Sequence, residues 1–254
     1  VRALESIAVL GNRDFNVVVL AAATSPDIAD AVEKKVESIV ENFRDLFPVA
    51  CVSHSFETLA KERLERSADD KERDGYSDLV SLRGYSNIRN FCLIAAELAG
   101  SEIAVLFDDD EVYEDPGYLD KVFQDMDSDY QGKPVRAIAG YYLQPQGGYL
   151  LPPPSEWWLS EWPMVESMNR AFSIIGEEPR LKKTPFVFGG NMAVHRDVFR
   201  RIPFDPNVRR GEDIDYLFNC KFFGVDFLLD SELSIRHLPP RTHVPAWQHF
   251  RENI

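Results

Sequence analysis

Apolar and polar positions follow two patterns along the first half of the chain. Uninterrupted apolar runs occupy residues 17–22, 49–52 and 103–107. Such runs are typical of strands buried on both faces of a parallel sheet, and they predict strands over 16–22, 49–52 and 103–107. Between the runs, apolar residues recur every three or four positions, which predicts helices over residues 2–10, 26–43, 56–70 and 86–98. Strand and helix in alternation predict an α/β fold with a mostly parallel central sheet flanked by helices.

The second half of the chain contains the same kinds of element. A helix is predicted over residues 116–126, and the apolar residues 135–142 predict a strand. A further strand starts near Phe186, carries Gly189 and Gly190 near its beginning, and leads into a helix. The last predicted elements are a helix over 216–223 and strands over 226–229 and 234–237.

The strand over residues 103–107 ends in four consecutive carboxylates, Asp108, Asp109, Asp110 and Glu111. Ligands of open α/β sheets bind beyond the carboxyl ends of the strands. Carboxylate oxygens at such a point are typical ligands of Mg²⁺ or Mn²⁺, and these cations in turn bind diphosphates. The alternative is a solvated acidic turn, because runs of charge are usually exposed.

The composition excludes some classes of partner. A formal net charge of −14 argues against a nucleic-acid partner, which would need a basic face. The short basic segments 180–183 and 209–210 could each bind one phosphate group. Three widely spaced cysteines fit reduced thiols and a cytoplasmic protein. No apolar run approaches the ~18 residues of a membrane span, which leaves peripheral membrane contact open.

Three of the four tryptophans, Trp157, Trp158 and Trp162, lie within six residues of one another and are flanked by prolines. Tryptophans at this density could clamp a long connection onto the core, because aromatic side chains dominate core burial. The alternative is a platform on which a sugar ring stacks. Both interpretations stay open at the level of the sequence.

Two further motifs carry chemistry. Adjacent glycines such as Gly189 and Gly190 in a strand usually mark a bulge or a backbone that something approaches closely. Downstream, Glu212, Asp213 and Asp215 begin a predicted helix, where carboxylates favour the helix dipole. The dipole effect alone would explain these acids as stabilisers of the helix. The functional alternative is that they take part in the reaction of a site.

The order of these motifs resembles the glycosyltransferase A fold, and in particular the large inverting family called family 2. Arg89-Asn90 resembles that family's Arg-Asn helix start, and residues 108–110 resemble its Asp-X-Asp motif. Residues 189–193 resemble its Gly-Gly-Asn-Met-Ala strand, and residues 211–215 resemble its Glu-Asp-X-Asp segment. The resemblance covers residues 1–240 as one domain, with a donor half at 1–115, an acceptor half at 116–240, and 241–254 as an extension.

The resemblance implies metal-dependent transfer of a sugar from a UDP- or GDP-type donor to a carbohydrate or small hydroxyl acceptor, with Mn²⁺ or Mg²⁺ as cofactor. It implies Asp213 as general base, with Glu212 as the second choice. The implied donor-binding residues are Arg89, Asn90, Asp108, Asp109, Gly189 and Gly190. The metal ligands would be Asp108, Asp110 and His237, and the acceptor would contact Asn191, Trp157, Trp158 and Trp162.

Three departures from the family pattern qualify these expectations. The family's first strand is expected to be missing, and Ala21 to Ser25 replace the acidic segment that usually contacts the base. The Gln-X-X-Arg-Trp motif of processive synthases is absent, which favours transfer of a single sugar. A retaining transferase of the same fold and a non-catalytic sugar-nucleotide-binding module remain as alternatives. A nucleotidyltransferase would usually carry an early glycine-rich basic loop, and the chain has none.

Overall fold

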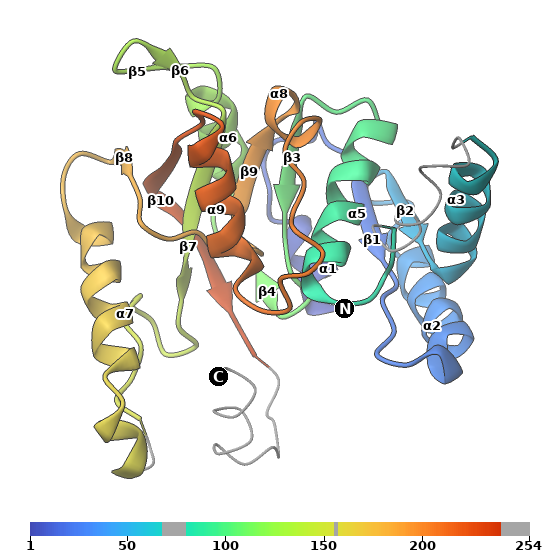
Figure 1. The fold of residues 1–254 in the computed structure, drawn as a ribbon, viewed down its shortest axis with the longest axis horizontal. Coiled ribbons are helices and arrows are strands. Elements are labelled where there is room, and N and C mark those ends of the chain that lie inside the picture. The colour runs from blue at the N-terminus through green and yellow to red at the C-terminus, as the bar shows by residue number, and fades with distance from the viewer. Residues whose placement is uncertain (68–79, 155–156, 240–254) are drawn as a thin grey trace.

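The computed structural model describes residues 1–67, 80–154 and 157–239, and the extension predicted at 241–254 lies outside them. The main sheet has the strand order β3-β9-β7-β10-β4, with β8 also paired to β10 (Figure 1). These strands span Ile103–Leu106 (β3), Met192–His195 (β9), Ala137–Leu143 (β7), Phe227–His237 (β10), Glu111–Val112 (β4) and Leu181–Lys183 (β8). Two smaller sheets pair β1 (Val17–Leu20) with β2 (Val49–Val52) and β5 (Asp129–Tyr130) with β6 (Lys133–Pro134).

The predicted α/β class is confirmed, but the main sheet is mixed rather than mostly parallel. β1 and β2 pair parallel, and so do β7 and β10. β9, however, runs antiparallel to both of its neighbours, β3 and β7, and the short β4 and β8 pair antiparallel with β10. Leu106 at the end of β3 is paired with Met192 at the start of β9. β9 therefore begins at the end of the sheet where β3 finishes and runs back along β3.

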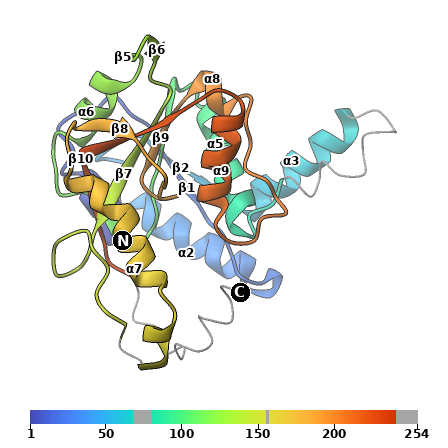
Figure 2. The ribbon, with the colours of Figure 1, turned by 60° about the vertical axis from the view of Figure 1, so that its left-hand side comes forward.

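The helices cover both faces of the sheet (Figures 1 and 2). On one face, α5 (Tyr85–Leu98) and α9 (Glu212–Phe222) contribute Leu93 and Tyr216 to a buried cluster with residues of β3, β7 and β9. On the other face, α1 (Arg2–Ile7), α2 (Ala29–Glu41) and α6 (Tyr118–Asp125) contribute Leu4, Val40 and Val122 to a second cluster. Each helix therefore buries an apolar stripe against the sheet, as the periodicity of the sequence predicts.

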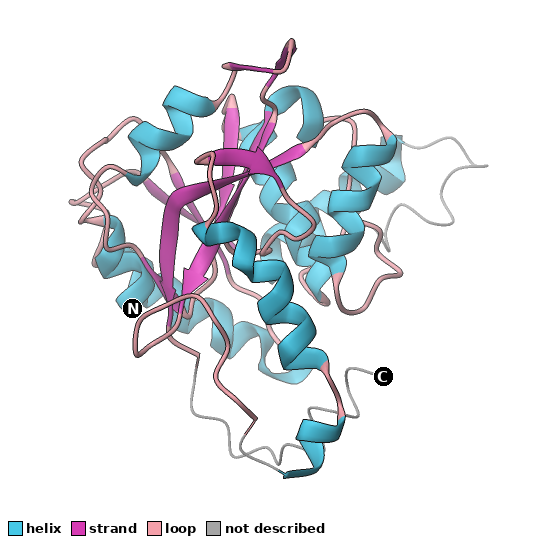
Figure 3. Ribbon diagram, turned by 90° about the vertical axis from the view of Figure 1, so that its left-hand side faces the viewer, coloured by secondary structure: helices cyan, strands magenta, loops and turns pink. Residues whose placement is uncertain are grey.

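The remaining helices complete the chain. η1 (Pro26–Ile28) precedes α2, α3 (His54–Ser67) follows β2, and α8 (Arg196–Phe199) follows β9. η2 (Trp157–Glu161), α7 (Met164–Phe172) and η3 (Ser173–Gly176) form an arm whose η2 end lies away from the sheet (Figures 1 and 3). Phe172 and Ile175 attach the arm to a small core that includes Phe186 and Leu229. Among the described residues, no helix is long and apolar enough to cross a membrane.

Candidate functional site

Five of the segments that the sequence analysis singled out meet at the end of the sheet where β3 and β10 finish. Arg89 of α5 contacts Asp108, which follows β3, and lies near Glu212 at the start of α9. Gly189 and Gly190, just before β9, lie against the same side chains. His237, the last residue of β10, contacts Asp110. The fold therefore brings together motifs that are far apart in the sequence.

Arg89 and Asp108 form a bidentate ion pair. The two Nη atoms of Arg89 donate to the two carboxylate oxygens of Asp108 at 2.6 and 2.8 Å. Nε of Arg89 lies 3.9 Å from an oxygen of Glu212. Burial alone would lower the pKa of the Arg89 guanidinium, but the contact with Asp108 outweighs it and holds the pKa above its ordinary value. Arg89 thus stays charged inside the protein.

The glycine pair is required by the side chains that pack on it. A Cβ atom at Gly189 would lie 2.7 Å from Nη2 of Arg89, and one at Gly190 would lie 2.6 Å from Oδ2 of Asp108 and collide with Glu111. A larger residue at either position would therefore displace these side chains from the Arg89–Asp108 pair. The close approach that the sequence predicts therefore exists, and it is made by groups of the protein itself.

Asp110 and His237 form the second pair of the site. Nε2 of His237 lies 3.3 Å from Oδ2 of Asp110, and the Leu238 N–H donates to the Asp110 carbonyl at 2.7 Å. The hydrogen bond with His237 lowers the pKa of the Asp110 carboxyl, so that Asp110 is ionised and able to accept a cation.

A carboxylate and an imidazole at this point suit a divalent cation that takes its other ligands from phosphates and water. Asp108 does not complete this pair, because Arg89 holds both of its carboxylate oxygens. Within the described residues, no group of three His, Cys, Asp or Glu side chains is arranged to hold a metal ion. Asp110 and His237 therefore fit a cation that the substrate helps to bind, rather than an all-protein cage.

Glu111 is a site residue that the sequence analysis did not single out. Its side chain is 1% exposed, and its Oε2 accepts the Asp108 N–H at 2.9 Å. Its Oε1 is buried and accepts no hydrogen bond of good geometry from the described groups, although the Tyr142 hydroxyl lies close to the carboxyl. Burial and the nearby charge of Asp108 raise the pKa of Glu111 to about 8. The run of four acidic residues in the sequence does not indicate that the side chain of Glu111 points into the protein interior.

The start of α9 places two further carboxylates beside Arg89 and the glycine pair. Glu212 is buried, and Asp213 accepts the Ile214 N–H at 2.8 Å and a hydrogen bond from the Gly189 backbone. Burial raises the pKa of both carboxyls above their ordinary values. Asp215, by contrast, accepts a hydrogen bond from Asn219 of the same helix at 2.8 Å, so its carboxylate has a partner within α9.

Both asparagines of the predicted site bind to the protein interior. Asn90 exchanges two hydrogen bonds with the backbone of Phe204, at 2.9 and 2.8 Å. Asn191 is fully buried; it accepts from the Tyr118 hydroxyl at 2.6 Å and donates to the Tyr141 carbonyl at 2.9 Å. In this structure they tie segments of the site together and present no free group to its surface. Asp109, between Asp108 and Asp110, is exposed.

The tryptophan segment lies in and next to η2. Trp157 is 80% exposed and Trp162 is 50% exposed, while Trp158 is partly buried. A core clamp is therefore wrong for Trp157 and Trp162. Their exposure is compatible with a stacking platform, which stays a prediction.

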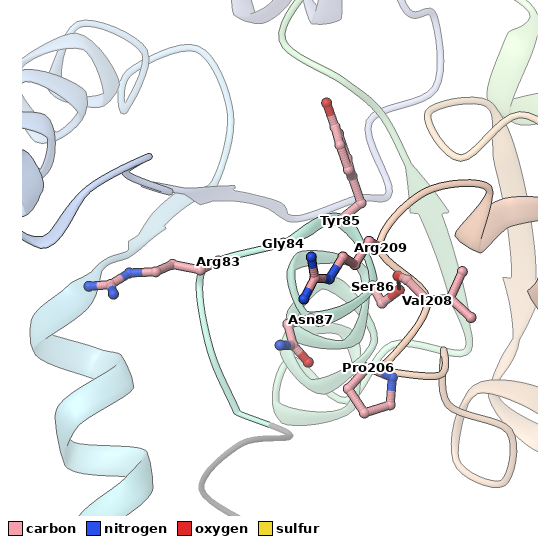
Figure 4. Close-up of a pocket in the computed structure, with 8 residues that line it drawn as sticks. All are labelled: Arg83, Gly84, Tyr85, Ser86, Asn87, Pro206, Val208 and Arg209. Atoms are coloured by element: carbon pink, nitrogen blue, oxygen red, sulfur yellow. Dashed lines mark hydrogen bonds between the residues drawn. The ribbon is translucent and has the colours of Figure 1, made fainter. Parts of the chain in front are cut away.

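A pocket of about 380 Å³ lies at the first turn of α5 (Figure 4). Its lining includes Asn87 of α5 together with Pro206, Val208 and Arg209 of the segment that precedes α9. The Ser86 hydroxyl donates to the Val208 carbonyl at 2.6 Å and fixes the two segments together. The guanidinium of Arg209 lies over the helix start, while the side chain of Arg83 points away from it (Figure 4).

Comparison with known proteins supports the fold. No protein-family model and no curated protein matches the sequence. Among solved structures, the chain is similar to the mannosyltransferase PcManGT from Pyrobaculum calidifontis in complex with GDP-Man and Mn²⁺, with a TM-score of 0.53 and 18% identity over 98% of this chain and 55% of that one. It is also similar to GalNAc-T7 with UDP, GalNAc and Mn²⁺, with a TM-score of 0.49 and 11% identity over 93% of this chain and 40% of that one. The chain thus spans about half the length of these proteins, and the likeness to the first confirms the predicted glycosyltransferase A fold.

Proposed function

We propose that this protein, which has a glycosyltransferase A fold, is a metal-dependent transferase that moves one sugar from a nucleoside-diphosphate sugar to an acceptor hydroxyl. The observation that carries the proposal is the meeting of three groups at one end of the sheet: the Asp110–His237 pair, the Arg89–Asp108 pair and Asp213. The similar mannosyltransferase was solved with GDP-Man and Mn²⁺, which supports a donor and a cation of this kind.

Asp110 and His237 would hold the cation. A cation held there would supply Lewis-acid stabilisation of the charge on the leaving diphosphate. The lowered pKa of Asp110 keeps its carboxylate ionised for this role. Asp108 is better placed to position Arg89 and the glycine pair than to bind the cation, because its oxygens are already bonded.

The pocket at the start of α5 is the place proposed for a phosphate group of the donor. Arg209 forms no ion pair or hydrogen bond with the parts of the chain that the structure describes, and its guanidinium lies over the pocket (Figure 4). Carboxylates are absent from the residues that line this pocket, although the chain as a whole is strongly acidic. An arginine in such surroundings favours a phosphate, to which it can donate two parallel hydrogen bonds.

Asp213 is proposed as the general base that accepts the proton of the attacking hydroxyl. Its raised pKa brings the carboxyl nearer to the pH at which it must both ionise and accept a proton. Glu212 is a weaker choice because it is buried beside Arg89 and committed to that charge. A base on the acceptor side implies inversion at the anomeric carbon.

The acceptor is proposed to be a carbohydrate or a small alcohol that stacks on Trp157 and Trp162. Both indoles are exposed, and the flat apolar face of a sugar packs well on such a ring. The segment lies outside the sheet, on the η2 arm, where an acceptor can reach it from solvent (Figure 3).

One sequence of measurements tests the function. UDP- and GDP-sugars are first screened with Mn²⁺ for an increase in melting temperature, and the donors that bind are then incubated with simple glycosides. We expect transfer with an inverted anomeric configuration, identified by proton NMR of the product. A retained configuration would instead assign Asp213 to acceptor binding. Donor binding without transfer or hydrolysis for every acceptor would identify a non-catalytic binding module.

A further inference from the structure

Tyr142 on β7 connects the two halves of the site, although no motif of the sequence includes it. Its ring stacks on His237, with 5.0 Å between ring centroids and 22° between planes. The same ring stacks on Phe188, with 4.3 Å between centroids and 23° between planes. Its hydroxyl accepts the N–H of Gly190 at 3.2 Å and interacts with the carboxyl of Glu111. One side chain thus contacts His237, Gly190 and the buried Glu111.

The ring contact determines how the imidazole of His237 faces Asp110. An imidazole at the end of a strand can rotate about its side-chain torsions, and each rotation moves Nε2 away from a given partner. Stacking on Tyr142 fixes the plane of the ring, and with that plane Nε2 lies 3.3 Å from the Asp110 carboxylate. Phe188 packs on Tyr142 and holds the tyrosine ring in turn.

The hydroxyl of Tyr142 acts at a different place, at Gly190 beside the Arg89–Asp108 pair. Gly190 is the residue at which a side chain would collide with Asp108 and Glu111. A hydrogen bond from the Gly190 N–H to Tyr142 keeps the glycine backbone at this closeness. Ring and hydroxyl therefore act on two different contacts of the site and can be removed separately.

We propose that Tyr142 is a positioning residue of the cation and donor site: its ring orients His237 toward Asp110, and its hydroxyl anchors Gly190 beside Asp108. The cation part of this inference rests on the proposed function. Groups that orient a metal-ligating histidine typically change metal affinity by 10- to 100-fold when they are removed.

Three variants separate the two contacts. Tyr142→Phe keeps the ring and removes the hydroxyl, whereas Tyr142→Leu removes both. Tyr141→Leu is the matched control, because Tyr141 is the neighbour on the same strand and its ring packs on Tyr149 instead. The metal-free measurements are the ¹⁵N NMR signal of His237 Nε2, which reports its contact with Asp110, and the hydrogen-exchange rate of the Gly190 amide. The metal-dependent measurement is Mn²⁺ affinity, from the electron paramagnetic resonance signal of free Mn²⁺.

We expect Tyr142→Leu to change the His237 Nε2 signal and to weaken Mn²⁺ binding about tenfold or more, with Tyr142→Phe and Tyr141→Leu close to wild type in both. In Tyr142→Phe, the hydrogen-exchange rate of the Gly190 amide should rise about tenfold, because the amide loses its hydrogen bond. An unchanged His237 signal in Tyr142→Leu, or an unchanged Gly190 amide in Tyr142→Phe, would overturn the corresponding half of the inference. A wild-type protein that binds no Mn²⁺ would refute the proposed function, and the two NMR measurements would still decide the positioning.

Discussion

Arg89 and Asp108 neutralise each other at the centre of the site, through two hydrogen bonds of 2.6 and 2.8 Å. Both belong to motifs that resemble donor-binding motifs, yet here each is the other's partner. The first carboxylate after β3 is therefore already paired with a cation, and the third, Asp110, is the one that faces His237. This division separates a structural ion pair from the pair that we assign to the metal.

The Arg89–Asp108 pair predicts a large effect on stability. Replacing Arg89 by Met should lower the free energy of unfolding by about 3 kcal/mol, because Asp108 and the buried Glu212 lose their compensating charge. Urea unfolding monitored by circular dichroism measures this change. The double variant Arg89→Met with Asp108→Asn should recover part of the loss. A single variant as stable as wild type would show that the pair contributes little.

We expect both Mn²⁺ binding and sugar transfer to depend on Asp110. Asp110→Asn should lose both Mn²⁺ affinity and sugar transfer, because one anionic ligand oxygen becomes a neutral amide. Asp109→Asn is the matched control for metal binding, since Asp109 is adjacent, acidic and exposed, and it should keep its Mn²⁺ affinity. Calorimetric titration with Mn²⁺ and a transfer assay measure the two. Equal Mn²⁺ affinity in Asp110→Asn and wild type would remove Asp110 from the metal site.

A buried cluster around Arg180, outside the candidate site, leads us to expect a pH dependence of stability. Arg180 donates to Asp125 and to Asp230, at 2.6 Å each, and both carboxylates are almost fully buried. Burial and the neighbouring Asp125 raise the pKa of Asp230 to about 6 from 3.8. A carboxyl with a raised native pKa contributes stability that is present below about pH 3.8 and lost as the pH rises through about 6.

Asp125→Asn tests this account. Oδ2 of Asp125 is buried without a hydrogen-bond partner among the described residues, and an amide there can donate to Asp230 and remove the like charge. The stability of Asp125→Asn relative to wild type should therefore rise by about 1 to 3 kcal/mol between pH 4 and pH 7. Urea unfolding at both pH values measures the difference, with the exposed Asp45→Asn as control. A relative stability that does not change with pH would contradict the shared titration.

The exposed indole of Trp157 predicts a separation of binding from stability. Because its side chain is 80% exposed, Trp157→Ala should leave the melting temperature nearly unchanged. It should weaken acceptor binding by about 1 to 3 kcal/mol if the ring is a platform. Calorimetric titration with the acceptor and thermal unfolding measure the two effects, and Trp158→Ala, at a partly buried ring, provides the comparison. Unaltered acceptor affinity in Trp157→Ala and Trp162→Ala would exclude the platform.

Local patterns predict much of this fold. Apolar runs and helical periodicity locate β1, β2, β3, α5 and α9 to within a few residues, because each of these elements buries the face that its own sequence marks. The motif order also predicts that Arg89, Asp108, Gly189 and Glu212 come together, as they do. The direction of β9 is not predicted, since it depends on which end of β3 the glycine pair meets.

Sequence patterns do not predict which partners the side chains of the site contact. Glu111 is indistinguishable from its three acidic neighbours until β4 turns it inward beneath Gly190. Tyr142 belongs to no motif, and its contacts with His237 and Gly190 join β7 to the end of β10 and to the segment before β9. Asn191 matches a family motif, yet its amide bonds to Tyr118 and Tyr141 rather than facing solvent. Each of these outcomes depends on residues distant in the sequence, which no local pattern records.

The most direct measurement of the central claim is turnover of a nucleoside-diphosphate sugar with Mn²⁺ by wild type, Asp213→Asn and Asp215→Asn, with donor affinity measured in parallel. Asp215→Asn is the control on the same helix, because Asp215 bonds to Asn219. We expect Asp213→Asn to bind the donor like wild type and to turn over about 10²-fold more slowly or worse, the usual effect of losing a general base, while Asp215→Asn keeps its turnover. Wild-type turnover in Asp213→Asn at saturating donor would contradict the proposed mechanism.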